Sequence, residues 1–127
     1  EIGIFEEGNA LKKKVMSIVT DSAPVEASKD PSGSTPFLLL SLLASPEETK
    51  EWETRYKAGG MGYGEVKKRL LQLIDEYFAP FRERRRELET DTDYVMDVLK
   101  DGGIRARAIA QQVMHRVREA TGLPASY

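Results

Sequence analysis

Basic side chains gather in two stretches of this sequence where acidic side chains are fewer. One stretch, residues 104–118, holds four arginines and no acid. The other follows a glycine-rich turn, GGMGYG at residues 59–64, and contains seven bases: Lys67, Lys68, Arg69, Arg82, Arg84, Arg85 and Arg86. A nearly neutral chain can therefore still carry one positive surface, as RNA binding requires. The alternative is two solvated helix faces whose charges pair with acids one turn away.

The glycine-rich turn has two interpretations. It follows a predicted helix rather than a strand, and no Lys-Ser or Lys-Thr pair closes it, so it matches no known phosphate-binding loop. In the first interpretation it only ends one helix and begins the next. In the second its glycines let a backbone come close to a ligand, because glycine has no Cβ. The ring of Tyr63 would then offer a stacking face, unless it packs on its own domain.

Other catalytic chemistry is not visible in the sequence. The single histidine, His115, has no second histidine and no triad partner at a recognisable spacing, and is expected to be a surface or half-buried helix residue. The acidic residues are scattered along helix faces and form no recognisable catalytic pair. There is no cysteine to ligate a metal or act as a nucleophile. The sequence therefore predicts no catalytic residue and no metal site.

Composition sets the class of protein. The chain has 127 residues, 40% hydrophobic and 31% charged, which suits one domain with a real core. Its formal charge of −2 excludes a uniformly basic surface, so any nucleic-acid role needs a local basic face. The longest apolar run, residues 36–44, is too short to cross a bilayer. The absence of cysteine excludes disulfides and agrees with a reducing compartment.

Apolar residues recur at helical spacing, and no stretch alternates with a period of two. Residues 20–35 are expected to form a loop or a partly mobile linker. A kink or a break is expected at Pro80, inside a long helical pattern from Glu65, because proline removes a helix hydrogen bond. Gly102–Gly103 is expected to end a short helix before a last one over 104–121. The predicted N-terminal caps are Asn9, Ser34 or Thr35, Ser45, and Asp91 or Thr92.

The pattern as a whole predicts an all-α fold, a helical bundle of about five or six helices. The residues expected in or near its core have apolar side chains at steps of three and four: Phe37, Leu40, Leu43, Trp52, Leu70, Ile74, Phe78, Ile109 and Val113.

Six blocks of the sequence, in this order and with these gaps, resemble the C-terminal part of bacterial tryptophanyl-tRNA synthetases. Together they cover nearly the whole chain, and several are long. The blocks are KKKVMSIVTDS (12–22), SPEET (45–49), GYGEVKK (62–68), LIDEYFAPFRERRREL (73–88), YVMDVLKDG (94–102) and RARAIAQQVMHRVREATGL (105–123).

The resemblance implies a class I aminoacyl-tRNA synthetase, which activates tryptophan with ATP and transfers it to tRNA. In this family the HIGH and KMSKS signatures lie upstream, and a stretch like residues 1–14 comes just after the KMSKS loop. Neither signature occurs here, and the chain begins at Glu1, so we expect a C-terminal fragment that is inactive alone. Residues 1–35 would be the segment after the KMSKS loop, a helix plus linker. Residues 36–127 would be the helical anticodon-binding domain.

The resemblance also implies the partners. No cofactor is expected in the fragment, whereas the parent enzyme would use ATP with Mg. The expected partner is tRNA(Trp), without DNA or membrane, in a cytoplasmic protein whose parent is a homodimer built mainly on the catalytic domain. The basic excess and the position of the blocks together suggest these tRNA-binding residues: Tyr63, Lys67, Lys68, Arg82, Arg85 and Arg86. By helical spacing, the last three share one side of their helix and Arg84 points away.

Two other classes of function stay open. One is a helical protein-interaction module with no RNA role, in which Phe37–Leu43 is a docking face. The other is a free-standing enzyme with an unrecognised site, which would require a deep pocket with convergent polar groups. In a fragment, apolar area near Ile2–Phe5, Val15–Ile18 or Phe37–Leu43 is expected to be exposed and able to pair with another copy.

Overall fold

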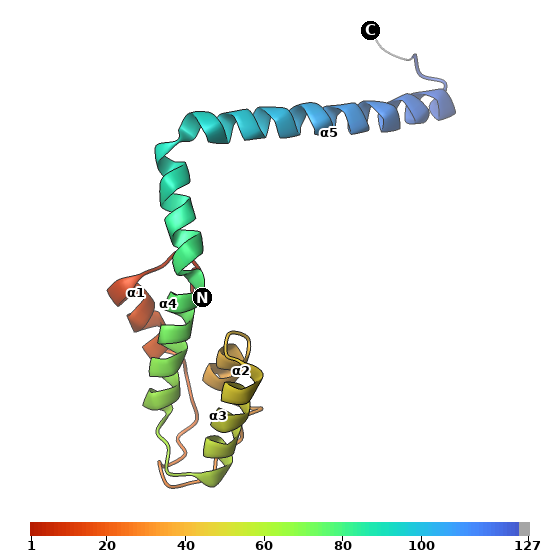
Figure 1. The fold of residues 1–127 in the computed structure, drawn as a ribbon. Helices are drawn as coiled ribbons and strands as arrows, with labels where there is room; N and C mark the ends of the chain where they lie inside the picture. Colours follow the sequence, from red (N-terminus) through yellow and green to blue (C-terminus); the bar gives the residue numbers. More distant parts are fainter. Residues whose placement is uncertain (125–127) are drawn as a thin grey trace. The chain divides into compact units, whose positions relative to one another are not determined.

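The computed structural model describes residues 1–124, and all regular structure in that range is helical. The predicted all-α class is therefore confirmed. Five helices follow one another along the chain (Figure 1): α1 (Gly8–Met16), α2 (Thr35–Ser41), α3 (Pro46–Ala58), α4 (Tyr63–Thr90) and α5 (Thr92–Thr121). No helix in the described range has both the length and the apolar character to cross a membrane.

The chain forms two compact units, and the boundary between them lies within α4. The first unit, Glu1–Arg82, holds α1, α2, α3 and the longer part of α4; the second begins at Glu83. Leu11 and Val15 of α1 belong to the core of the first unit, so residues 1–35 fold together with α2 and α3. The domain boundary expected at residue 35 stays a prediction about the family's architecture.

The caps of α2 and α3 are the ones that the sequence predicts. Ser34 Oγ accepts a hydrogen bond from Phe37 N at 3.5 Å, and Ser45 Oγ accepts one from Glu48 N at 3.2 Å. In both helices a proline occupies the first turn, where its missing N–H costs nothing. α1 differs slightly from the prediction: it begins at Gly8 rather than after Asn9, and its N-cap makes no side-chain hydrogen bond.

The core of the first unit lies between α4 and the three shorter helices. Figure 1 shows α1 on one side of α4, with α2 and α3 on the other. Tyr56, Leu40 and Leu70 are fully buried there, and the Phe37 and Tyr56 rings meet edge to face at 5.2 Å between centroids. Seven of the nine predicted core residues are buried or packed against this cluster: Phe37, Leu40, Leu43, Trp52, Leu70, Ile74 and Phe78.

For the other two residues that were expected in the core, the prediction is wrong. Ile109 and Val113 lie on α5 and are 65% and 42% exposed. No residue of α5 is buried in the structure. Their spacing does mark one apolar face, but no other segment of the second unit covers it within the described residues.

Neither expected helix break occurs. α4 continues through Pro80, so it is one helix and not two, and the kink expected there as the alternative stays a prediction. α5 likewise continues through Gly102 and Gly103, because a glycine in a helix interior costs only about 1 kcal/mol relative to alanine and does not forbid the conformation. The start of α5 is as predicted, since Asp91 Oδ1 accepts a hydrogen bond from Tyr94 N at 3.1 Å. It ends at Gly122, whose φ is +70°.

The segment expected to be a loop or linker is a loop held by two buried polar groups. The ammonium of Lys29 donates to the carbonyl oxygens of Pro24, Val25 and Ala27 at 2.8, 3.1 and 3.0 Å. The hydroxyl groups of Ser34 and Tyr56 lie 2.9 Å apart. Because the Lys29 ammonium satisfies the loop's own carbonyls, the loop packs against the end of α3 without a regular element.

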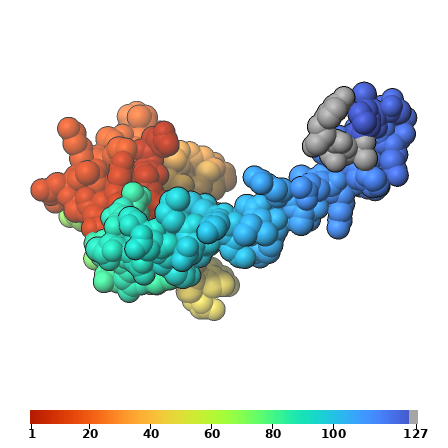
Figure 2. Space-filling model, turned by 90° about the horizontal axis from the view of Figure 1, so that it is seen from above, coloured from red at the N-terminus to blue at the C-terminus, as the bar shows by residue number. Residues whose placement is uncertain are grey.

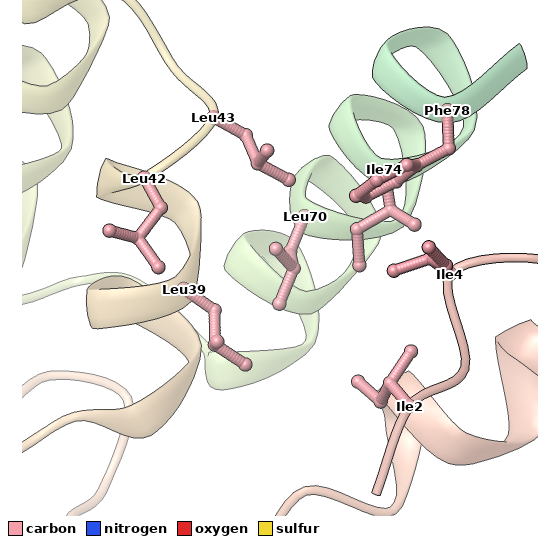
Figure 3. Close-up of a pocket in the computed structure, with 8 residues that line it drawn as sticks. All are labelled: Ile2, Ile4, Leu39, Leu42, Leu43, Leu70, Ile74 and Phe78. Carbon is pink, nitrogen blue, oxygen red and sulfur yellow. The ribbon is translucent and has the colours of Figure 1, made fainter. Parts of the chain in front are cut away.

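An apolar cavity opens on the first unit, with a volume of about 200 Å³. Figure 3 shows its eight side chains converging from the N-terminal segment, from α2 and the turn after it, and from α4: Ile2, Ile4, Leu39, Leu42, Leu43, Leu70, Ile74 and Phe78. Leu42 is 77% exposed at its edge. Exposed apolar area is therefore confirmed near Ile2–Phe5 and Phe37–Leu43. Within Val15–Ile18, Met16 is 37% exposed, whereas Val15 is fully buried.

Candidate nucleic-acid interface

Tyr63 begins α4, where the glycine-rich turn ends, and its side chain is held by its own domain. Its hydroxyl donates to Asp21 Oδ1 at 2.7 Å, and its ring meets the ring of Tyr56 edge to face at 6.2 Å. Partial burial and the Asp21 carboxylate raise the pKa of Tyr63 to about 12. The same hydrogen bond, followed by one from Ala23 N, lowers the pKa of Asp21. Tyr63 is thus packed, with only part of its surface open for stacking.

Glycine stands at positions 59 and 60 for different structural reasons. Gly59 ends α3 with φ +77°, and a Cβ there would lie 2.4 Å from the carbonyl oxygen of Glu26. Gly60 also has a positive φ, +74°, but a Cβ there would meet nothing within 4 Å. The close backbone approach that glycine permits is therefore made within the protein, between Gly59 and the loop at residues 26–27. The glycine at the end of α3 thus lets the loop lie directly against that end of the helix.

Lys67 lies in the interior, although the sequence suggests it as an RNA contact. It is only 9% exposed, and its ammonium donates to the carbonyl oxygens of Met16 and Ile18 at 3.1 and 2.6 Å. These carbonyls stand at the end of α1, where the helix has no N–H groups left to satisfy them. Lys67 therefore joins α4 to the end of α1, while its neighbour Lys68 is exposed.

This difference predicts unequal effects for two adjacent substitutions. Lys67→Met should lower the free energy of unfolding of the first unit by about 1–2 kcal/mol, because two carbonyls lose a charged donor. Lys68→Met should change it by no more than about 0.5 kcal/mol, as is usual at exposed positions. Urea unfolding followed by the fluorescence of Trp52, the single tryptophan, measures both. Equal losses in the two variants would contradict the structural role of Lys67.

Arg82 is also buried, with 5% of its surface exposed. Its Nε donates to the carbonyl oxygen of Ile4 at 3.2 Å, and its Nη1 donates to Asp75 Oδ1 at 2.9 Å. Glu7 adds a carboxylate oxygen 3.8 Å from Nε. These contacts hold the N-terminal segment against α4. Helical spacing alone suggests that Arg82 shares one open face with Arg85 and Arg86. Its burial shows that it does not.

The three consecutive arginines after Arg82 are exposed and paired along the same helix. Arg84 pairs with Glu87 at 2.8 Å, Arg85 with Glu89 at 2.7 Å and Arg86 with Glu83 at 3.1 Å. Each pair is solvated on both partners, so each contributes only about 0–1 kcal/mol. A phosphate can therefore replace a glutamate at little cost. These arginines lie in the second unit, and Lys68 and Tyr63 lie in the first.

Two cations that organise the first unit are not among the tRNA-binding residues that the sequence suggests. Lys29 holds the loop, and its ammonium also lies 5.7 Å from the centre of the Tyr63 ring. Arg69 grips Glu48 with two hydrogen bonds, of 2.6 Å from Nε and 3.0 Å from Nη2, and this lowers the pKa of Glu48. The pair joins α3 to α4. No local sequence signal indicates either role. Arg69 pairs with an acid 21 positions away, and Lys29 binds backbone carbonyls, which every residue carries.

Several relatives match nearly the whole chain. The tryptophan–tRNA ligase of Rhodopirellula baltica is 46% identical over 120 residues, which are 94% of this chain and 38% of that protein. The tryptophan–tRNA ligase of Fusobacterium nucleatum is 41% identical over 122 residues, which are 96% of this chain and 37% of that protein. This chain thus spans well under half the length of the curated relatives that it matches. No family model matches it.

Solved structures agree with the sequence matches. The crystal structure of tryptophanyl-tRNA synthetase from Campylobacter jejuni superposes with a TM-score of 0.82 at 38% identity, covering 96% of this chain and 40% of that one. A second structure of the same synthetase, in complex with ADP and tryptophan, gives the same score and identity. The matched part is the C-terminal part of the synthetase. In sequence and in fold, the chain is therefore homologous over nearly its whole length to the C-terminal region of bacterial tryptophan–tRNA ligases.

Proposed function

We propose that this chain is the helical C-terminal part of a tryptophan–tRNA ligase and that it binds the anticodon arm of tRNA(Trp). The observation that carries the proposal is the match of 94–96% of the chain, at 38–46% identity, to ligases of that name. The longer enzyme would activate tryptophan with ATP and transfer it to tRNA. The cavity of the first unit has only aliphatic and aromatic walls, which offer no donor to a phosphate, so we place no nucleotide there.

The structure divides the proposed RNA contacts by accessibility. Lys68, Arg85 and Arg86 are exposed, so we assign them direct contact with RNA. Tyr63 offers the open part of its ring, whereas Lys67 and Arg82 act as positioning residues because their nitrogens already hold backbone carbonyls. Lys68 lies in the first unit and the arginines lie in the second, so the two groups are tested separately.

The experiment measures binding of the chain to an RNA hairpin with the stem and loop of the tryptophan anticodon arm, at several salt concentrations. If Arg85 or Arg86 contacts a phosphate, its change to alanine should weaken binding to any loop sequence and flatten the salt dependence by about one unit. If it reads a base, the change should cost roughly 1–3 kcal/mol and reduce the preference over a hairpin with a different anticodon. Lys68→Ala tests the first unit in the same way.

Arg84→Ala is the matched control, because Arg84 is exposed and pairs with a glutamate on the same helix, as Arg85 and Arg86 do. Lys67→Met, as long as it folds, should bind the hairpin as the unchanged chain does. Small, equal effects at positions 68, 84, 85 and 86 would refute the assignment and leave these charges as solvated faces.

A protein-interaction module is the second candidate function, and the open apolar cavity supports it. Its edge is formed by Leu42 and Ile4, which are 77% and 49% exposed. If the chain does not bind the hairpin even at low salt, this candidate takes precedence. The cavity of the first unit gives no support to a free-standing enzyme, because its walls carry none of the convergent polar groups that catalysis needs.

A further inference from the structure

The four arginines of the basic stretch at residues 104–118 all lie on α5, and no residue of this helix is buried. In the view of Figure 2 the side chains of the later part of α5, in blue, stand at the surface. Arg105 pairs with Asp101 at 3.1 Å, one turn back along the helix. Arg107 has no ion pair within residues 1–124, because no acidic residue lies three or four positions before or after it. An anion that binds Arg107 therefore displaces water and no carboxylate.

Arg107 lines an open hollow of about 520 Å³ on α5. The residues that line it in the described part of the chain are Lys100, Gly103, Ile104, Arg107, Ala108 and Gln111. They recur at steps of three and four, so they share one side of the helix. Lys100 and Arg107 lie about 10 Å apart along the helix axis. A Cβ on Gly103 would meet no atom within 4 Å, so the glycine leaves the space between the two cations open.

This combination of groups suits one strand of RNA. Phosphates of the strand can lie at Lys100 and at Arg107, where a cation neutralises each of them. The hollow between the cations then receives a sugar and a base, whose polar edges the amide of Gln111 can meet with both a donor and an acceptor. Ile104, which is 62% exposed, offers an apolar surface to the flat face of the base. A free phosphate ion would use the cations but leave the hollow empty.

The acidic residues near the hollow lie at one end of it. Asp97 is one turn before Lys100, and Asp101 follows Lys100 but pairs with Arg105. From residue 102 to residue 118 the chain contains no acid. Along this helix the electrostatic potential is therefore most positive near Arg107, so Arg107 is expected to contribute more to anion binding than Lys100.

We propose that the hollow holds a segment of the RNA strand, with phosphates at Lys100 and Arg107 and the intervening nucleoside over Gly103. The inference rests on the proposed function and extends it, since it gives α5 an RNA contact separate from those of Arg85 and Arg86. Those two arginines exchange a glutamate for a phosphate, whereas Arg107 exchanges only water. The contact also gives glycine at position 103 a use that helix formation does not explain, because alanine there would stabilise the helix.

The first test compares arginines on opposite sides of α5, with the same hairpin and the same series of salt concentrations. Arg107→Ala should weaken binding and flatten the salt dependence by about one unit, and Lys100→Ala should act in the same direction less strongly. Arg116→Ala is the matched control. Arg116 also has no ion pair within residues 1–124, and its position along the helix places it half a turn around from Arg107. Its loss should leave the salt dependence unchanged.

The second test fills the hollow without changing any charge. Gly103→Leu should weaken binding of the hairpin, because the new side chain occupies the space of the nucleoside. Gly102→Leu is the matched control, since Gly102 does not line the hollow and a Cβ there also meets no atom within 4 Å. Circular dichroism should show undiminished helical content in both variants, because leucine is a better helix former than glycine.

Inorganic polyphosphate, which has phosphates but no sugar or base, separates the two parts of the proposed contact. Its binding should fall in Arg107→Ala, because a cation is lost. It should stay unchanged in Gly103→Leu, because no nucleoside has to enter the hollow.

Each failure has its own signature. If Arg107→Ala changes the salt dependence no more than Arg116→Ala, or if Gly103→Leu binds the hairpin as well as Gly102→Leu, the hollow holds no RNA. Losses at Arg85 and Arg86 would then still support the proposed function. If Gly103→Leu weakens polyphosphate as much as the hairpin, no nucleoside enters the hollow and the proposal is wrong. If the chain binds no hairpin even at low salt, both the proposed function and the α5 contact are refuted.

Discussion

Replacing Gly59 with alanine should lower the free energy of unfolding of the first unit by about 2–5 kcal/mol, through backbone strain together with overpacking. The backbone at Gly59 has φ +77° and ψ −173°, a region that is open essentially only to glycine. The new Cβ would also lie 2.4 Å from the carbonyl oxygen of Glu26, which belongs to backbone and cannot turn aside. Urea unfolding followed by the fluorescence of Trp52 measures the loss.

Gly60→Ala is the matched control for this prediction. Gly60 has nearly the same φ, +74°, but a Cβ there meets no atom within 4 Å. Gly60→Ala should therefore lower the free energy of unfolding only through backbone strain, by about 1–2 kcal/mol. The difference between the two variants reports the contact with the loop at residues 26–27 together with any difference in strain between the two positions. If Gly60→Ala is as destabilising as Gly59→Ala, strain alone explains both, and the close approach contributes nothing.

The second large effect is expected at Arg82. Arg82→Ala should lower the free energy of unfolding of the first unit by about 2–4 kcal/mol. It removes the hydrogen bonds of a charged donor and the packing of the buried aliphatic part of the side chain. Its partners Asp75 and Glu7 are about half exposed, so they regain water and keep the loss below that of a fully buried pair. One nitrogen, Nη2, is buried without a hydrogen-bond partner in the described residues, which also limits what the side chain contributes.

The control is Arg84→Ala, because the Arg84 side chain is 59% exposed. This substitution should lower the free energy of unfolding by no more than about 0.5 kcal/mol. A second measurement separates anchoring from general packing. Arg82 holds the carbonyl oxygen of Ile4, so hydrogen exchange at the amide of Glu6, which donates to Gly3 at 3.0 Å, should accelerate in Arg82→Ala. Unchanged exchange at Glu6, or similar losses at both arginines, would show that Arg82 does not hold the N-terminal segment.

The predicted RNA contacts show how far helical spacing carries an argument about a site. Spacing correctly places Lys67 and Lys68 on one helix and Arg82 near Arg85 and Arg86. It does not reveal that Lys67 and Arg82 are buried, because their partners are carbonyl oxygens 49 to 78 positions earlier in the chain. A long cationic side chain looks the same in the sequence whether it binds phosphate or satisfies the end of another helix.

Local signals determined most of the helical starts and stops. Ser34, Ser45 and Asp91 are caps because a side-chain oxygen beside its own backbone satisfies an N–H three positions on, a relation contained entirely in the sequence. Glycine and proline were weaker guides within helices. Pro80 and Gly102 reduce helical stability, but the surrounding helical residues keep α4 and α5 continuous.

By itself, the sequence determined the all-α class, the three caps, most of the core of the first unit and the resemblance to tryptophanyl-tRNA synthetases, since these depend on residue types at short, regular spacing. Tertiary structure alone decided which cations are free to meet a ligand and which apolar face stays uncovered. Lys67 and Lys68 are neighbours with the same chemistry, yet one is enclosed by α1 and the other faces water. Burial depends on segments that are distant in the chain, and periodicity along one helix carries no information about which of those segments will cover it.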